Sequence, residues 1–376
     1  MPRDVYIVSA IRTPIGRGRA EGALHSFHAV HLLAQTLEGC VQQAGVDKKF
    51  IEDVITGCVS PVGEQGACIG RVAALQAGFP IETPSVQINR FCGSGQQAVH
   101  FAAQAIAAGD MDLVIASGVE MMSRVPIGSD ASFSEEFKKQ FPHPIVHQGW
   151  SAELLAEKWG LTRDDLDGYS AQSHARAYAA GKAGWTAREL MPLGGLTGHE
   201  GVRASIDLGK MAMLPTVFKK HGVVTAGNAS QISDGAAAVM LASEDACVRH
   251  GLKKRARVMT RVVVGSDPEM MLDGPIEATH RALKKAGLTM AQIDVVEINE
   301  AFASVVLAWA KAHKADMSRV NIQGGAIAHG HPLGATGAVL MTKLVNILER
   351  TGGRYGLQTM CEGFGMANAT IVERVG

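Results

Sequence analysis

The chain has 376 residues, of which 47% are hydrophobic and only 5% aromatic, so it can bury a large aliphatic core in one large α/β unit or in two domains. Its 36 Lys and Arg residues balance its 36 Asp and Glu residues, and no long block of like charge occurs. This balance argues against nucleic acid or an anionic membrane as a partner. No apolar stretch approaches the roughly 20 residues needed to cross a bilayer.

Six cysteines are scattered along the chain without a CxxC pair, and no secretory leader precedes the first strand-like run, VYIVSA at 5–10. Scattered thiols of this kind are typical of proteins in a reducing compartment. We therefore expect free cysteines and a cytoplasmic location.

Short β-branched runs, often followed by one of the 43 glycines, alternate with Ala-rich stretches, which indicates an α/β fold. One such unit begins with a strand at 85–89 and a glycine-rich turn that carries Cys92. A helix at 96–108 and a strand at 113–118 complete it.

A second unit repeats this plan near the C-terminus. A strand at 319–323 leads to a glycine-rich turn that carries His331, then to a helix at 335–350 and a strand at 356–361. The repeat predicts a duplicated fold whose two halves bring these turns together.

Residues 124–224 differ from both halves because they are polar, contain proline and include a long amphipathic stretch. We interpret them as an inserted helical cap, which either forms a wall of a ligand site or only stabilises the fold. The expected division is 1–123 with 225–250 for the N-terminal half and 251–376 for the C-terminal half.

Cys92 is the first candidate for chemistry, because Gly93, Ser94 and Gly95 follow it and an Ala-rich helix begins there. A thiol at a helix N-terminus has its pKa lowered by the helix dipole, which favours a reactive thiolate. The alternative is a buried structural cysteine.

His331 lies in the irregular loop GGAIAHGHPLGATG, immediately before Pro332, and is a plausible base for a thiol. His329 in the same loop is expected in a wall or at the surface. Cys361 ends the second unit and is a possible acid and base, although packing in the core is the ordinary role of such a residue. Asn299, at a strand end, can hold a water or donate to an oxyanion, although turn capping is its ordinary role. No cluster has metal-ligand spacing, so no metal is predicted.

Seven ordered motifs resemble those of the thiolase family over almost the whole chain. They are VSAIRTPIG, NRFCGSG, SGVEMMSRVP, TAGNAS followed by DGAAAV, INEAFA, GGAIAHGHPLGATG and CEGFG. The resemblance implies a layered sandwich of two similar βαβ-type halves with the inserted cap.

The resemblance also implies roles for individual residues. Cys92 would be the acylated nucleophile, His331 its activator and Cys361 the second acid and base. Asn299 would hold a water that binds the thioester oxygen together with His331, and the amides of Cys92 and Gly363 would form the other oxyanion hole. The implied reaction cleaves a 3-ketoacyl-CoA with CoA, or condenses acetyl-CoA in reverse, through an acyl-enzyme.

Coenzyme A is implied as a substrate rather than as a permanently bound cofactor. The positions that match the family's CoA contacts are Ser230, Ala226, Ala301, Phe302, Met271, His147 and, more loosely, Arg203.

Four features depart from the family pattern. Phe364 stands where glycine is usual, His329 where an apolar residue is usual and Gln231 where glycine is common, and the segment 124–146 is short. The short segment favours a homodimer over a homotetramer.

Two other functions stay open. A decarboxylating ketosynthase-like condensing enzyme shares the fold and a Cys nucleophile, and an acyl-CoA or lipid-binding protein could use the scaffold with little turnover.

Overall fold

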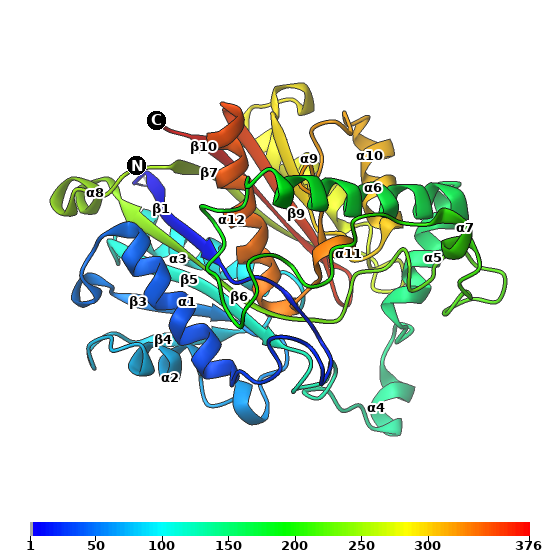
Figure 1. The fold of residues 1–376 in the computed structure, drawn as a ribbon, viewed down its shortest axis with the longest axis horizontal. Helices are drawn as coiled ribbons and strands as arrows, with labels where there is room; N and C mark the ends of the chain where they lie inside the picture. The colour runs from blue at the N-terminus through cyan, green and yellow to red at the C-terminus, as the bar shows by residue number, and fades with distance from the viewer. Residues whose placement is uncertain (1–2) are drawn as a thin grey trace.

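The computed structural model describes residues 3–376. Their strands follow one another in a continuous hydrogen-bonded order that divides into two similar halves (Figure 1). Five strands form the N-terminal half, in the spatial order β4 (Ser85–Ile88), β3 (Asp53–Gly57), β5 (Leu113–Met121), β6 (Ser233–Ser243), β1 (Val5–Arg12). Four form the C-terminal half, in the order β7 (Ala256–Gly265), β10 (Met366–Arg374), β9 (Tyr355–Glu362), β8 (Val295–Ile298). The short β2 (Gly16–Arg17) pairs with β6.

The two halves repeat the same pairing pattern, as the duplication predicted. In the N-terminal half β3 lies parallel to β4 and β5, and β6 runs antiparallel to β5 and β1. In the C-terminal half β8 lies parallel to β9, and β10 runs antiparallel to β9 and β7. The halves join where β1 pairs with β7 through Tyr6 and Ile7.

One predicted strand is wrong. At 319–323 only Val320 pairs, as an isolated parallel bridge to Val296. Asn321 has a φ of 46°, in the left-handed region, so the extended chain ends there. Its side chain instead bonds the backbone N–H and C=O of Ile298, each at 2.9 Å.

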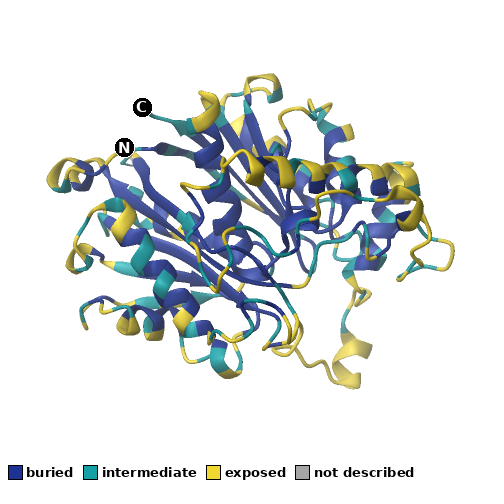
Figure 2. Cartoon of the chain, in the orientation of Figure 1, coloured by how far each residue is buried: buried dark blue, intermediate teal, exposed yellow. Residues whose placement is uncertain are grey.

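The core helices of the two halves pack against each other between the sheets. They are α3 (Ser94–Ala108) and α12 (Leu333–Thr351), within two residues of the predicted limits, and α12 contacts strands of both halves. Outer helices cover the other faces, with α1 (Ala29–Ala44) and α2 (Ile69–Gln76) on the N-terminal half and α9 (Gly274–Ala286), flanked by α10 (Ala303–His313), on the C-terminal half. The sheets and the middle layer are buried (Figure 2), which makes the layered sandwich.

The interval 124–224 holds helices, as expected for the cap. They are α4 (Glu135–Gln140), α5 (Gln148–Lys158), α6 (Arg163–Lys182) and α7 (Leu208–Ala212). α5 and α6 pack on α10, whereas α4 projects from the body and is exposed (Figures 1 and 2). The exact domain limits stay a prediction.

The remaining short helices connect these elements. They are α8 (Glu244–His250), α11 (Ala326–His329) and the 3₁₀ turns Lys48–Phe50, Gly63–Gln65 and Met290–Gln292. Among residues 3–376, no helix combines the length and apolar composition that crossing a membrane requires.

The crossing of α3 and α12 depends on two glycines. A Cβ on Gly95 would lie 2.8 Å from the amide nitrogen of Ala338, and a Cβ on Gly337 would clash with the backbone of Gln96. The two helices therefore touch backbone to backbone, and no side chain fits between them.

We predict opposite effects for two Gly→Ala substitutions in helices. Gly337→Ala should lower the free energy of unfolding by about 1–3 kcal/mol because the new methyl overpacks the crossing. Gly168→Ala, in α6 with open space around the added atom, should raise it by up to about 1 kcal/mol through helix propensity. Urea unfolding of both variants checks this, and equal stability of the two would contradict the crossing.

Candidate active site

Cys92 lies in a tight turn between β4 and α3 and is only 4% exposed. The Ser94 hydroxyl closes the turn, because it accepts from the Arg90 amide at 2.8 Å and donates to the Phe91 carbonyl at 2.6 Å. Phe91 itself has a φ of 46°, a left-handed conformation that a bulky residue adopts only when its surroundings impose it. The turn therefore holds the thiol in one defined position.

The predicted depression of the Cys92 pKa is wrong. Burial raises the pKa of this thiol to about 12, and the nearby carboxyl of Glu362 raises it further, although a hydrogen bond from the Gln148 side chain lowers it. α3 begins two residues later, at Ser94, and burial outweighs its dipole. The resting residue is a neutral thiol.

Cys361 lies near the end of β9, buried, with Ala367 of β10 opposite it. Burial raises its pKa well above the ordinary value, and the next largest cause is the charge of Cys92. The two thiols are therefore electrostatic neighbours, although they belong to different halves of the fold.

The His331 loop holds its imidazole in a defined tautomer. Nδ1 lies 2.6 Å from Oγ1 of Thr336, and that hydroxyl donates its own proton to the Pro332 carbonyl at 2.8 Å. Thr336 must then accept from Nδ1–H, which leaves Nε2 unprotonated, as an acceptor. Burial lowers the pKa of His331 to about 4, so the ring is neutral near pH 7.

Asn299, just after β8, joins this group. Its Nδ2 lies 3.3 Å from Nε2 of His331, and its backbone amide donates to Thr359 at 3.1 Å. Its buried Oδ1 has no hydrogen-bond partner among residues 3–376. A buried amide oxygen needs a partner, so it can hold a water or a substrate group.

His329 is buried, so the expectation of a surface position is wrong. It is 2% exposed and its ring packs on His199 with centroids 5.0 Å apart. Its Nε2 lies 3.5 Å from the ammonium nitrogen of Lys343. The loop turns at Gly330, which separates His329 from His331 and places it in a buried polar cluster.

Gly363 and Phe364 form the hairpin turn between β9 and β10. A Cβ on Gly363 would lie 3.0 Å from the Phe91 ring, so a side chain there would require that ring to move. Phe364 has a φ of 56°, which explains why glycine is usual at this position. Its ring packs toward the α4 segment, with centroids 5.7 Å from Phe91, 6.1 Å from Phe133 and 6.4 Å from Phe141.

Most residues expected at the CoA site share one region. The amide of Ser230 donates to the Ala301 carbonyl at 3.0 Å, and Phe302 and Met271 pack in the same apolar cluster as Ala301. His147 reaches Phe302 through Phe218, whose ring stacks on His147 at 4.8 Å and meets Phe302 edge-on at 6.1 Å.

The other two residues expected at the CoA site, Ala226 and Arg203, are exposed. Ala226 is exposed at the start of the same loop as Ser230. Arg203 is exposed, and its backbone amide donates to His174 on α6 at 3.2 Å. None of the contacts found within residues 3–376 links Arg203 to the Ser230 region.

Three side chains of this site were not predicted from the sequence. Thr336 sets the His331 tautomer, the Gln148 side chain lowers the pKa of Cys92, and the Glu362 charge raises the pKa of both thiols. A hydroxyl one turn into the helix after His331 was a usable signal for Thr336, and Gln148 directly follows His147. Glu362 could have been identified as a charged residue at the end of a buried strand.

Within the part of the chain that the structure describes, no group of three or more His, Cys, Asp or Glu side chains could hold a metal ion.

Comparison with known proteins places this geometry in a family. Residues 5–245 match the N-terminal domain model of thiolase, and residues 252–374 match the thiolase C-terminal domain model. A steroid 3-ketoacyl-CoA thiolase of Mycobacterium tuberculosis is 47% identical, over 99% of this chain and 94% of the relative. A 3-ketoacyl-CoA thiolase of Vibrio cholerae is 42% identical, over 98% of this chain and 99% of the relative.

Solved structures agree with these matches. The crystal structure of human mitochondrial 3-ketoacyl-CoA thiolase superposes with a TM-score of 0.92 at 36% identity and covers 100% of this chain and 99% of its own. The same human protein has been solved in complex with CoA, again with a TM-score of 0.92. With both family domains matched in order along the chain and the fold shared throughout, this chain belongs to the thiolase family of acyltransferases.

Proposed function

We propose that this enzyme cleaves a 3-ketoacyl-CoA with free CoA, and condenses acyl-CoA thioesters in the reverse direction, through an acyl-enzyme on Cys92. The observation that carries this proposal is the pairing of two buried thiols with a neutral imidazole whose Nε2 is free to take a proton. The names of the relatives support the substrate class.

The first half-reaction begins when Cys92 gives its proton to Nε2 of His331 and its sulfur attacks the 3-keto carbon. The bond between C2 and C3 then breaks, and the electron pair stays on the acetyl-CoA enolate. Cys361 protonates that enolate, which releases acetyl-CoA and leaves the shortened acyl group on Cys92. The backbone amides of Cys92 and Gly363 bind the oxyanion, while water held by Asn299 with His331 binds the thioester oxygen.

The second half-reaction restores the thiols. The proton on His331 passes to the Cys361 thiolate, which frees the imidazole to take the proton of an incoming CoA thiol. That sulfur attacks the acyl group on Cys92, and the departing Cys92 sulfur regains its proton from His331. Each residue regains its starting protonation state: the original Cys361 proton leaves in acetyl-CoA, the Cys92 proton passes through His331 to Cys361, and the CoA thiol supplies the proton that ends on Cys92.

Coenzyme A is proposed to bind as a substrate along the Ser230 region. Ala301, Phe302 and Met271 offer an apolar wall. His147 caps the start of α5 and precedes Gln148, whose side chain lowers the pKa of Cys92. This arrangement would guide the pantetheine arm toward the thiol. The human neighbour solved with CoA supports this class of ligand.

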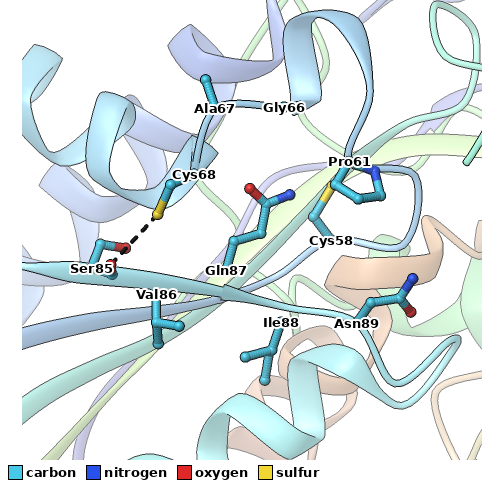
Figure 3. Close-up of a pocket in the computed structure, with 10 residues that line it drawn as sticks. All are labelled: Cys58, Pro61, Gly66, Ala67, Cys68, Ser85, Val86, Gln87, Ile88 and Asn89. Atoms are coloured by element: carbon cyan, nitrogen blue, oxygen red, sulfur yellow. Dashed lines mark hydrogen bonds between the residues drawn. The ribbon is translucent and has the colours of Figure 1, made fainter.

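A homodimer is the proposed assembly, formed through the free edge of β4. Val86 on this strand is 44% exposed and the adjoining Ile81 is 77% exposed, an apolar sheet edge of the kind that a second copy covers. A shallow pocket opens at the same edge between β4 and the start of α2 (Figure 3). Sedimentation equilibrium should give twice the chain mass, and Val86→Lys should give a monomer; a native monomer or tetramer would refute it.

A cytoplasmic location is proposed from the thiols. All six cysteines are free, and Cys92 and Cys361 must stay reduced for the proposed reaction. Cell fractionation tests this, and recovery with a membrane or secreted fraction would contradict it.

The experiment that tests the proposed reaction follows thioester loss from acetoacetyl-CoA and from a longer 3-ketoacyl-CoA, each with and without free CoA. We expect cleavage only with CoA, and loss of it in Cys92→Ala. Tight binding with no CoA-dependent cleavage would point to an acyl-CoA carrier instead. Decarboxylation of malonyl-CoA would point to a ketosynthase-like enzyme; the comparisons favour neither alternative.

His331 and His329 should differ sharply as alanine variants. His331→Ala removes the proposed base and should lower turnover on the order of 10²-fold or more. His329→Ala leaves that base in place and should keep most activity per folded molecule, although it removes a buried contact. Steady-state kinetics corrected for folded fraction by circular dichroism compare them, and equal losses of turnover would show that the roles are misassigned.

A further inference from the structure

Glu362, the last residue of β9, is a fully buried carboxyl that the proposed reaction does not use. Its relative exposure is 0%, and neither of its side-chain oxygens has a hydrogen-bond partner among residues 3–376. A buried carboxylate without a partner is costly, so the group is either neutral or has another task.

The Glu362 carboxyl packs against Gly93, the residue that follows the proposed nucleophile. A Cβ on Gly93 would clash with Oε1 of Glu362, so the carboxyl occupies the space where a side chain at 93 would stand. The Asn368 amide beside it donates to the Gly93 carbonyl at 3.2 Å and does not bond the carboxyl. Glu362 therefore packs against the Cys92 turn at Gly93.

The duplicated fold provides an internal comparison. Glu120 takes the matching place near the end of β5, but its oxygens accept from the amides of Val59 at 2.9 Å, Ser60 at 3.1 Å and Gly334 at 2.8 Å, and from the Gln65 side chain at 2.8 Å. These bonds tie Glu120 to the start of α12. Burial raises the pKa of Glu120 as well, but its hydrogen bonds oppose that rise and fix the carboxyl in place. Glu362 lacks such bonds at the start of α3, so its carboxyl is not held in one protonation state.

The charged groups that face Glu362 act in opposite senses. Burial raises the pKa of its carboxyl to about 8, and the Arg90 guanidinium opposes that rise. In turn, the Glu362 charge raises the pKa of both Cys92 and Cys361, and Glu120 adds a smaller effect on Cys92. The carboxyl and the two thiols therefore titrate as a coupled group.

We propose that Glu362 is a positioning residue that governs acyl transfer through the charge of Cys92: its neutral acid form permits the Cys92 thiolate, and its carboxylate form opposes it. This inference rests on the proposed nucleophilic role of Cys92. It concerns how readily that thiol ionises, which can be measured without turnover.

The sign of the pH effect follows from this coupling. Below pH values near 8 Glu362 is neutral and leaves Cys92 unaffected. As the pH rises through that region the carboxylate forms and holds the Cys92 proton more tightly. The native enzyme should therefore gain reactive thiolate more slowly with pH than an enzyme with a neutral group at 362.

The test measures the rate of iodoacetamide alkylation at Cys92, by peptide mass spectrometry, from about pH 6 to about pH 10. Glu362→Gln keeps the shape and removes the charge. At the alkaline end it should react roughly tenfold faster than native enzyme, the effect of one pKa unit, and at the acid end the two rates should agree. Glu277→Gln, a half-exposed site on α9, is the matched control and should follow the native profile.

Two results would overturn the proposal. One is a Glu362→Gln profile that superimposes on the native profile, and the other is a change by the same factor at every pH, which a merely structural role would produce. If alkylation follows the expected profile while CoA-dependent cleavage is absent, the proposed function fails, and only the effect of Glu362 on Cys92 ionisation stands. The reverse combination leaves the function intact and removes this inference.

A measurement on the native chain covers the case in which Glu362→Gln does not fold. Infrared spectra across the same pH range follow the C=O stretch of protonated carboxyl groups, and Glu362 should contribute a band at neutral pH that disappears as the pH rises through about 8. The rate of native Cys92 alkylation should begin to lag behind the rise in pH over the same interval. A Glu362 band that is lost before neutral pH, or one that persists to about pH 10, would contradict the proposal.

Discussion

The backbone contact between α3 and α12 is the constraint on which the rest of the structure depends. Gly95 and Gly337 let the two helices meet without side chains between them, in the middle layer of the sandwich. Each helix begins beside a reactive turn, one carrying Cys92 and the other His331. Leu333, which opens α12, packs in the same apolar cluster as Cys92. The crossing thus sets the relative position of the turns that carry Cys92 and His331, the proposed nucleophile and base.

Burial then decides the charge of every group at this site. It raises the pKa of Cys92 and Cys361 and lowers the pKa of His331, so the resting thiols and imidazole are neutral near pH 7. A neutral imidazole with a fixed Nδ1–H can accept a proton only at Nε2, beside Asn299. Chemistry must therefore begin with proton transfer between buried groups, where a nearby charge such as that of Glu362 has a large effect.

The fold class and the two reactive turns could be predicted from sequence because both halves carry the same order of strand, turn, helix and strand. The strand at 319–323 could not, because Asn321 bonds the β8 backbone through its side chain, which propensity does not reveal. The thiol pKa was predicted with the wrong sign, since a helix start is visible in sequence and the depth of burial is not. Thr336 and Glu362 gain their importance only from contacts across the fold.

The central claim, that this geometry makes Cys92 the acyl carrier, is tested most directly by trapping the intermediate. The enzyme is mixed with acetyl-CoA without an acceptor thiol, quenched in acid and digested. The masses of the cysteine-containing peptides are then measured by mass spectrometry. The account predicts one acetyl group on the peptide that contains Cys92, removed when free CoA is added before the quench and absent in Cys92→Ala. An acetyl group on the Cys361 peptide instead, or none on any cysteine of an enzyme that turns over, would contradict it.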